Sequence, residues 1–141
     1  MKLIVDASVV IKWYVAEIDT AAARQLYVDE RFLFCVPGHA FGEIGNALAT
    51  YVRRGLLPRS QIPHIGRQLN DRITSYPIER PIPPAIEIAL EIGSTVYDAL
   101  YVALAAELDS VVATADMRLV EAASRSSWRD RVNLFTHLTG S

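Results

Sequence analysis

The sequence predicts an α/β fold built on a mostly parallel sheet of four or five strands. Short apolar runs within Lys2–Val5 and residues 110–114 have the length and composition of strands buried on both faces. Segments of helical length separate such runs, and this alternation is typical of parallel sheets. A chain of 141 residues, 51% hydrophobic and 21% charged, suits one globular domain, so we expect a single domain over residues 1–141.

The first half of the chain is expected to hold two strands and four helices. Ser8 can cap a short helix after the first strand, and Asp19 or Thr20 can cap the next, because their side-chain oxygens accept free backbone N–H groups. Gly55 ends a long third helix, since glycine readily adopts the left-handed conformation that closes a helix. The expected order is a strand over Lys2–Val5, helices over 9–15 and 20–28, a strand over 32–36, and helices over 38–54 and 58–73.

The second half is expected to supply the remaining strands and three helices. A proline-rich turn opens one helix, and Gly93 ends it. Thr95, with Asp98 three residues later, resembles a capping box at the start of an alanine-rich helix. The expected order is a weak strand over 76–78, helices over 84–92 and 94–108, a strand over 110–114, a helix over 116–124 and a strand over 132–135.

The composition excludes several classes of protein. The single cysteine, Cys35, rules out an internal disulfide, and the three histidines lack the spacing of a zinc site. No apolar stretch reaches the roughly 18 residues of a membrane span. Asp6 and Lys12 interrupt the apolar N-terminal run, so it makes a poor signal peptide. We therefore expect a cytoplasmic protein that is not inserted in a membrane.

Two acidic residues directly follow predicted strands. Asp6 comes after the first strand, and Asp116 comes after the strand over 110–114. Ligands of open parallel sheets bind beyond the carboxyl ends of the strands, which is where both residues should lie. Each of them, like Asp98, also fits the ordinary role of a residue at a helix N-terminus. Taken singly, none of the three indicates chemistry.

Glu43 lies among small and apolar residues in the helix expected over 38–54. Asn46 and Thr50 follow it at helical spacing, so a narrow polar stripe crosses this helix and continues to Arg53 and Arg54. A solvent-facing surface of three turns normally carries lysines and several glutamates, and this one does not. An exposed face and a functional stripe both remain open at this point.

Four carboxylates brought together would need a neutralising partner. Two unit charges about 4 Å apart repel by about 4 kcal/mol at an effective dielectric constant near 20. A proton or a cation must offset that repulsion, and oxygen ligands without histidine or thiolate select Mg²⁺ or Mn²⁺. Such a cation can lower the pKa of a bound water and stabilise charge on a phosphodiester. It would also weaken the objection to a nucleic-acid substrate that the net charge of −2 raises.

Four blocks of sequence resemble the PIN-domain family, specifically the VapC-type toxins of prokaryotic toxin–antitoxin pairs. They occur in family order and at family spacing over nearly the whole chain, so the ordered set is specific although each block alone is weak. The blocks are residues 4–13 (IVDASVVIKW), Pro37 with residues 43–48 (EIGNAL) and 54–55 (RG), residues 97–105 (YDALYVALA), and residues 114–119 (TADMRL).

The resemblance implies a three-layer α/β/α sandwich that carries an endoribonuclease site dependent on Mg²⁺ or Mn²⁺. The acidic positions of the family fall on Asp6, Glu43, Asp98 and Asp116, which would be the catalytic and metal-binding residues. Its accessory polar positions fall on Ser8, Asn46 and Thr114. The resemblance also implies a homodimer, and an antitoxin whose C-terminal segment occupies the active-site groove.

The hypothesis that follows is hydrolysis of RNA phosphodiesters by a metal-activated water. Asp6 and Asp98 would be the principal metal ligands, with Asp116 completing the site, and Glu43 would bind a second metal or orient the water. The candidates for phosphate contact, which would position RNA without reading its sequence, are Arg53, Arg54 and Arg118.

Other functions are compatible with acidic residues above a parallel sheet. A receiver-type phosphoacceptor domain needs a lysine late in the chain, but the lysines here are Lys2 and Lys12. A haloacid-dehalogenase-like phosphatase needs a second aspartate where Ser8 stands. The alternative that remains is a catalytically inactive PIN-like scaffold that binds RNA or a basic partner peptide.

Overall fold

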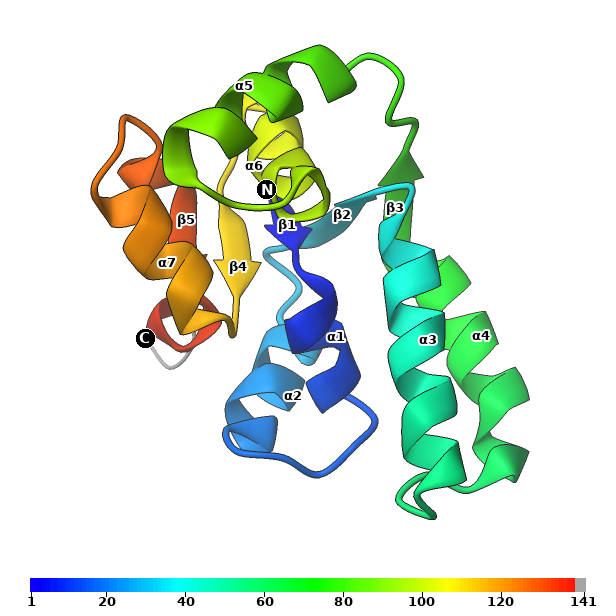
Figure 1. Cartoon of the computed structure of the whole chain (residues 1–141). Helices are drawn as coiled ribbons and strands as arrows, with labels where there is room; N and C mark the ends of the chain where they lie inside the picture. The colour runs from blue at the N-terminus through cyan, green and yellow to red at the C-terminus, as the bar shows by residue number, and fades with distance from the viewer. Residues whose placement is uncertain (139–141) are drawn as a thin grey trace.

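Five parallel strands form one sheet in the order β3-β2-β1-β4-β5 (Figure 1). The structure is a computed structural model that describes residues 1–138. The central strand is β1 (Lys2–Val5), which pairs with β2 (Leu33–Pro37) on one side and β4 (Val112–Thr114) on the other. The edge strands are β3 (Ile73–Tyr76) and β5 (Val132–Leu134). The predicted parallel sheet of four to five strands is confirmed.

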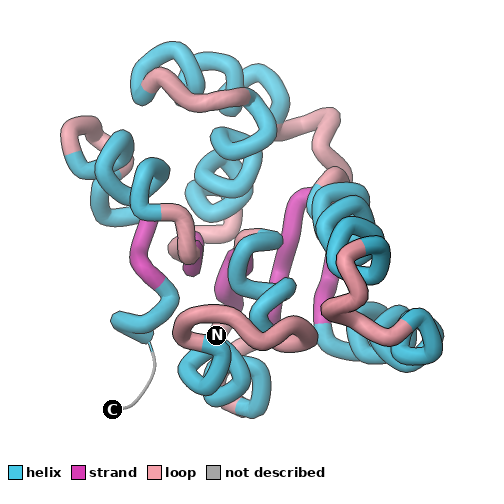
Figure 2. Tube along the Cα trace, turned by 60° about the horizontal axis from the view of Figure 1, so that its bottom comes forward, coloured by secondary structure: helices cyan, strands magenta, loops and turns pink. Residues whose placement is uncertain are grey.

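Seven α-helices accompany these strands within residues 1–138, and Figure 2 shows them surrounding the sheet. The strand residues of β1 and β4 are buried on both faces apart from Lys2, as expected of a parallel sheet covered on both sides. Short 3₁₀ segments lie at Arg59–Gln61, Arg129–Arg131 and Phe135–Leu138. The helices are α1 (Ala7–Lys12), α2 (Thr20–Val28), α3 (Ala40–Arg53), α4 (Ile62–Arg72), α5 (Ile82–Ile92), α6 (Val96–Glu107) and α7 (Met117–Ser124).

The helix α6 forms the centre of the core. It lies against β1, β2 and β4, and all of its residues from 99 to 105 are buried. The small alanines in this segment let the helix approach the sheet closely. Because the segment is buried all round, it has almost no polar face. Its N-terminus therefore holds Asp98 at a fixed position relative to the ends of the central strands.

Glycine ends two of the helices as predicted. Gly55 follows α3 with φ of 73°, and Gly93 follows α5 with φ of 74°. Glycine adopts this left-handed conformation without strain, whereas residues with a Cβ atom rarely do. The two glycines therefore account for both helix ends.

Three local predictions are wrong. Ser8 does not cap α1: the N-cap position belongs to Asp6, and the Ser8 hydroxyl donates a hydrogen bond to the Asp6 carboxylate instead. The weak strand expected at residues 76–78 lies earlier, at Ile73–Tyr76, because pairing with β2 extends the chain directly after α4. The helix expected over 58–73 begins with a 3₁₀ turn before α4.

Within residues 1–138, no single helix is both long and apolar enough to cross a membrane. The helices α5 and α6 reach the necessary length and composition only as a pair, and the chain bends by 116° between them.

Candidate active site

Asp6 lies at the carboxyl end of the central strand and is 9% exposed. Two hydroxyl groups hold its Oδ2 atom. The Thr114 hydroxyl donates to it at 2.6 Å, and the Ser8 hydroxyl donates to it at 2.8 Å. Although Asp6 occupies the N-cap position of α1, its side chain makes no capping hydrogen bond. The ordinary structural role of an aspartate at a helix start therefore does not explain this residue.

The same two hydroxyls join the ends of β1 and β4. The backbone N–H of Ala115 donates to the Ser8 oxygen at 3.1 Å, and that of Asp116 donates to the Thr114 oxygen at 3.0 Å. Because β1 and β4 are neighbours in the sheet, residues 106 or more positions apart in sequence meet here. Ser8 and Thr114, both predicted as accessory residues, thus position Asp6 and anchor the loop that carries Asp116.

Asp98 and Asp116 lie at the N-termini of α6 and α7. The backbone N–H of Asp98 donates to the Thr95 hydroxyl at 3.1 Å, which confirms the predicted capping interaction of Thr95. The Asp116 carboxylate accepts the backbone N–H of Arg118 at 2.9 Å and so caps α7. Both aspartates, with Thr95 and Arg118, line a cavity of about 300 Å³.

Glu43 reaches the site from α3, where Tyr101 and His39 hold its Oε1 atom. The Tyr101 hydroxyl, on buried α6, donates to Oε1 at 2.6 Å. His39 Nε2 lies 3.6 Å from the same oxygen and 3.0 Å from the Tyr97 carbonyl oxygen. The polar stripe thus begins at a residue whose carboxylate binds the core helix α6 and does not simply face solvent.

Sequence reasoning missed Tyr101 and His39. Tyr101 stands in an apolar helix, where an aromatic residue normally belongs to the core. Its position three residues after Asp98 places both side chains on one face of α6, and that spacing could have identified it. His39 occupies the N-cap position of α3; its side chain is only 11% exposed and contacts the Tyr101 ring at 5.2 Å between ring centroids.

The four carboxylates share one electrostatic environment. Burial contributes most to raising the pKa of Asp98, which reaches about 6. The negative charges of Asp6, Asp116 and Glu43 contribute to the same rise. Burial also raises the pKa of Asp6, with further contributions from Glu43 and Asp116 that its two hydroxyl partners oppose. Burial and the negative charges of neighbouring elements therefore both disfavour the charged forms of Asp6 and Asp98.

The donor chemistry of this cluster fits a hard divalent cation. Only carboxylate and hydroxyl oxygens gather around Asp6, and Mg²⁺ and Mn²⁺ prefer such ligands. Within residues 1–138, the hydrogen bonds to Asp6, Glu43 and Asp116 engage one oxygen of each carboxylate. In that same part of the chain, no three His, Cys, Asp or Glu side chains already form a ready-made metal site. The residues suit the cation by type and charge, and their side chains would have to turn towards it.

The other predicted residues lie at different distances from the carboxylates. Asn46 is exposed on α3, three residues beyond Glu43. Arg53 and Arg54 are exposed at the far end of the same helix, about 15 Å from Glu43 along its axis. Arg118 is the one predicted arginine that lines the cavity beside Asp98 and Asp116.

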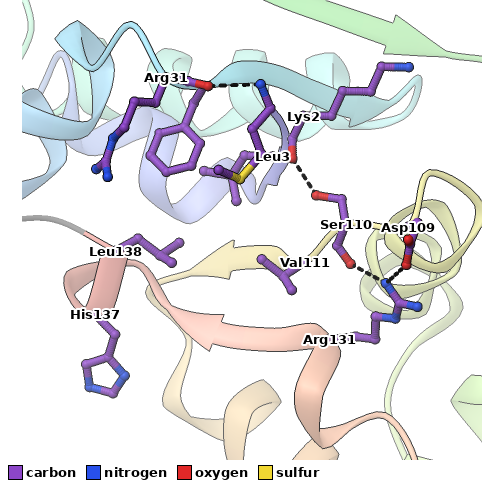
Figure 3. Close-up of a pocket in the computed structure, with 11 residues that line it drawn as sticks. Lys2, Leu3, Arg31, Asp109, Ser110, Val111, Arg131, His137 and Leu138 are labelled. Carbon is purple, nitrogen blue, oxygen red and sulfur yellow. Dashed lines mark hydrogen bonds and ion pairs between the residues drawn. The ribbon is translucent and has the colours of Figure 1, made fainter.

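A separate cavity of about 410 Å³ lies by the amino ends of β1 and β4, at the opposite end of these strands from Asp6 and Asp116 (Figure 3). It contains none of the four carboxylates. Its walls include Leu3, Val111 and Leu138, and Arg131 at its rim donates hydrogen bonds to Asp109 and to the Ser110 carbonyl. Its surroundings are mainly apolar, and its cations have protein partners, so it does not compete with the carboxylate cluster as a catalytic site.

Comparisons with known proteins agree with this fold. Residues 3–124 match the PIN domain family model. The chain is 33% identical over 126 residues to Ribonuclease VapC3 of Pyrobaculum aerophilum, covering 86% of this chain and 94% of that protein. The crystal structure of PAE2754 from Pyrobaculum aerophilum is similar with a TM-score of 0.67 at 21% identity, over 98% of this chain and 87% of that one. Mycobacterium tuberculosis VapC20, a toxin that cleaves the sarcin–ricin loop, is similar with a TM-score of 0.66 at 15% identity, over 85% and 94% of the two chains.

Proposed function

The chain belongs to the PIN-domain family, and on that premise we propose that the cluster around Asp6 is the active site of a toxin that hydrolyses RNA. The protein is an endoribonuclease of the VapC type, the toxin component of a toxin–antitoxin pair. As in PIN-domain nucleases generally, its activity depends on a divalent metal ion, for which we propose Mg²⁺ or Mn²⁺.

The observation that carries this proposal is that carboxylates from four elements gather where burial and neighbouring negative charge raise the pKa of Asp6 and Asp98. A protein gains no stability from gathering like charges in a partly buried site. Such an arrangement is useful where a cation binds, because a cation would offset the repulsion and stabilise charge on a phosphodiester. The raised pKa of Asp98, at about 6 and caused first by burial and then by the other carboxylates, supports a site that accepts a positive partner.

In the proposed site, Asp6, Asp98 and Asp116 would hold the cation, and Glu43 would bind a second one or orient the attacking water. A bound divalent ion supplies a Lewis acid that makes water more acidic and stabilises charge on the phosphate. Ser8 and Thr114 fix the Asp6 carboxylate through its Oδ2 atom, so its other oxygen can face the cation. Tyr101 fixes Glu43 in the same way.

Arg118 is the proposed phosphate contact nearest to the carboxylates. It lines the cavity that Asp98 and Asp116 share, and a guanidinium group there can pair with phosphate oxygens of the RNA backbone. Arg53 and Arg54 are exposed at the end of α3, where they would contact a more distant part of the RNA. Such contacts position the substrate and carry little sequence information.

The proposed partners are an RNA substrate in the cytoplasm, an antitoxin and a second copy of the chain. An antitoxin with a basic side chain in the groove would offset the same repulsion as the cation, and would thereby inhibit the enzyme. Sedimentation analysis of the purified protein tests the homodimer. The measured mass should be twice that of one chain.

An RNA cleavage assay tests the function. Antitoxin-free protein with Mg²⁺ or Mn²⁺ should cut RNA internally, and EDTA should abolish the cutting. Asp6→Asn and Asp98→Asn should reduce cleavage to the EDTA background, whereas Asp71→Asn, an exposed aspartate on α4, should cleave like the parent. Cleavage by Asp6→Asn at the parental rate would refute the assignment of the site, and a lack of cleavage by the parent itself would favour the non-catalytic scaffold.

A further inference from the structure

A second cavity adjoins the carboxylates on the side away from Asp98. It lies between α1 and α3 and has a volume of about 340 Å³. Glu43, Ala47 and Tyr51 follow one another at intervals of four residues, so one face of α3 leads from the carboxylates into this cavity. The residues that line it are Ser8, Ile11, Lys12, Glu17, Ala47, Tyr51 and Ala115.

The cavity shares a wall with the candidate active site. Ser8 lines the cavity and donates to the Asp6 carboxylate at 2.8 Å. Ala115 also lines it, donates its backbone N–H to Ser8, and lies between Thr114 and Asp116. Tyr51 lies about 12 Å from Glu43 along α3. A chain bound with one group at the carboxylates can therefore place a neighbouring group in this cavity.

The far end of the cavity combines an aromatic ring with a carboxylate and cations. Tyr51 and Glu17 both line the cavity, and the negative charge of Glu17 contributes to a raised pKa of the Tyr51 hydroxyl that burial mainly causes and Arg54 opposes. Lys12 donates to the Ile18 carbonyl at 2.8 Å and so carries an ammonium group at the cavity wall. A ring that can stack, an acceptor beside it and positive charge nearby form a set of groups that suits a nucleotide.

We propose that this cavity is a subsite for the base of a nucleotide next to the scissile phosphate. In this subsite, the Tyr51 ring stacks on the base, and Glu17 accepts a hydrogen bond from its exocyclic amine. Lys12 lies near the adjacent phosphate. Adenine, cytosine and guanine carry such an amine and uracil does not, so the subsite disfavours uracil. The inference rests on the proposed ribonuclease function, and it adds a source of base preference that the carboxylates cannot supply.

Cleavage of matched RNA oligonucleotides tests the subsite. The cut site is first mapped in a single-stranded RNA. Oligonucleotides are then made that carry each of the four bases in turn at the two positions that flank the cut. The metal-loaded parent should disfavour uracil about tenfold in kcat/KM at one of these positions. Glu17→Ala should lose that preference there while binding Mn²⁺ with parental affinity.

Variants at two further positions separate the ring from the charge. Tyr51→Ala should raise KM about tenfold, and Tyr51→Phe, which keeps the ring, should not. Lys12→Met should raise KM equally for all four bases. Its control is Lys2→Met, because Lys2 is the other lysine of the chain and lies at the amino end of β1, at the opposite end of that strand from Asp6; it should cleave like the parent.

The outcomes distinguish the subsite from the function on which it rests. Loss of uracil discrimination in Glu17→Ala, with unchanged Mn²⁺ binding, supports the subsite. Parental cleavage with the same base preference in Glu17→Ala overturns the subsite and leaves the ribonuclease function intact. A metal-loaded parent that cleaves none of the RNAs overturns the ribonuclease function and the subsite with it.

Discussion

At the residue scale, the charge of Asp98 lowers the stability of the metal-free fold. Its pKa is about 6 in the folded protein and 3.8 in an unperturbed aspartate, mainly because of burial and then because of Asp6, Asp116 and Glu43. A carboxyl group whose pKa is raised on folding contributes its full stability at pH values below its unfolded-state pKa, here 3.8. That contribution disappears as the pH rises through about 6. At neutral pH the metal-free protein therefore holds an unfavourable charge.

Replacing that charge should stabilise the metal-free protein. In EDTA at pH 7.5, we expect Asp98→Asn to increase the free energy of unfolding by on the order of 1 kcal/mol. The gain should shrink as the pH falls from 6 towards 4, since the parent carboxyl then becomes protonated. Urea denaturation of both proteins at several pH values measures the difference. A gain that is the same at pH 4 and pH 7.5 would contradict the electrostatic explanation.

Tyr101 is expected to act on the site through Glu43. Tyr101→Phe removes the hydroxyl that donates to Glu43 at 2.6 Å and keeps the buried ring. We expect Mn²⁺ affinity or kcat to fall by about 10-fold, the usual effect of losing a group that orients a ligand. Tyr97→Phe on the same helix is the control, because Tyr97 is 64% exposed. Equal metal affinity and kcat in the two variants would leave Tyr101 with a packing role alone.

At the residue scale, the sequence drew attention to Glu43 because a lone acid interrupts a small, apolar helix face, and to Asp6 because it follows a buried strand. The family resemblance then assigned both to the site, and their catalytic roles stay predictions. Tyr101 escaped, since a tyrosine in an apolar helix looks the same in sequence whether or not its hydroxyl binds a carboxylate. Asn46 has helical spacing from Glu43 and is exposed on α3, and its accessory role stays a prediction.

At the scale of single elements, Gly93 fixes the turn that presents the N-terminus of α6 to the site. Its φ of 74° ends α5, and the cavity of Asp98 and Asp116 includes it. Neither Gly93 nor Gly66, within α4, has an atom within 4 Å of an added Cβ. Only backbone conformation distinguishes the two positions.

Alanine at these two glycines should therefore have opposite effects. Gly93→Ala should destabilise the protein by about 1 kcal/mol, because alanine is strained at positive φ. Gly66→Ala should stabilise it by up to about 1 kcal/mol, because glycine is unfavourable inside a helix. Thermal or urea unfolding of both variants measures the two shifts. Destabilisation of similar size in both would show that space, not conformation, decides the effect.

Helices with clear caps were easier to predict than short strands. Thr95 and Asp98 gave the start of α6, and Gly55 and Gly93 gave the ends of α3 and α5. The strand β3 was misplaced by three residues, because its position depends on pairing with β2 and not on its own composition. Ser8 was taken for a cap because a serine after a strand has that role locally, whereas its hydroxyl is used across the sheet.

For the whole molecule, the alternation of strands and helices was enough to predict a parallel α/β sheet. The strand order β3-β2-β1-β4-β5 was not predicted, although it determines which strand ends meet. Because β1 lies between β2 and β4, Asp6 and Asp116 follow neighbouring strands, and α3 and α6 bring Glu43 and Asp98 to the same place. The assignment of residues 1–141 to one domain stays a prediction.

The central claim is that four carboxylates distant in sequence form one site that a divalent cation completes. Calorimetric titration of Mn²⁺ into the RNA-free protein at pH 7.5 tests it most directly. We predict that the parent and Asp71→Asn bind Mn²⁺ with equal affinity, and that Asp6→Asn and Asp98→Asn each lose most of that binding while remaining folded. Parental Mn²⁺ affinity in both Asp6→Asn and Asp98→Asn would contradict the claim.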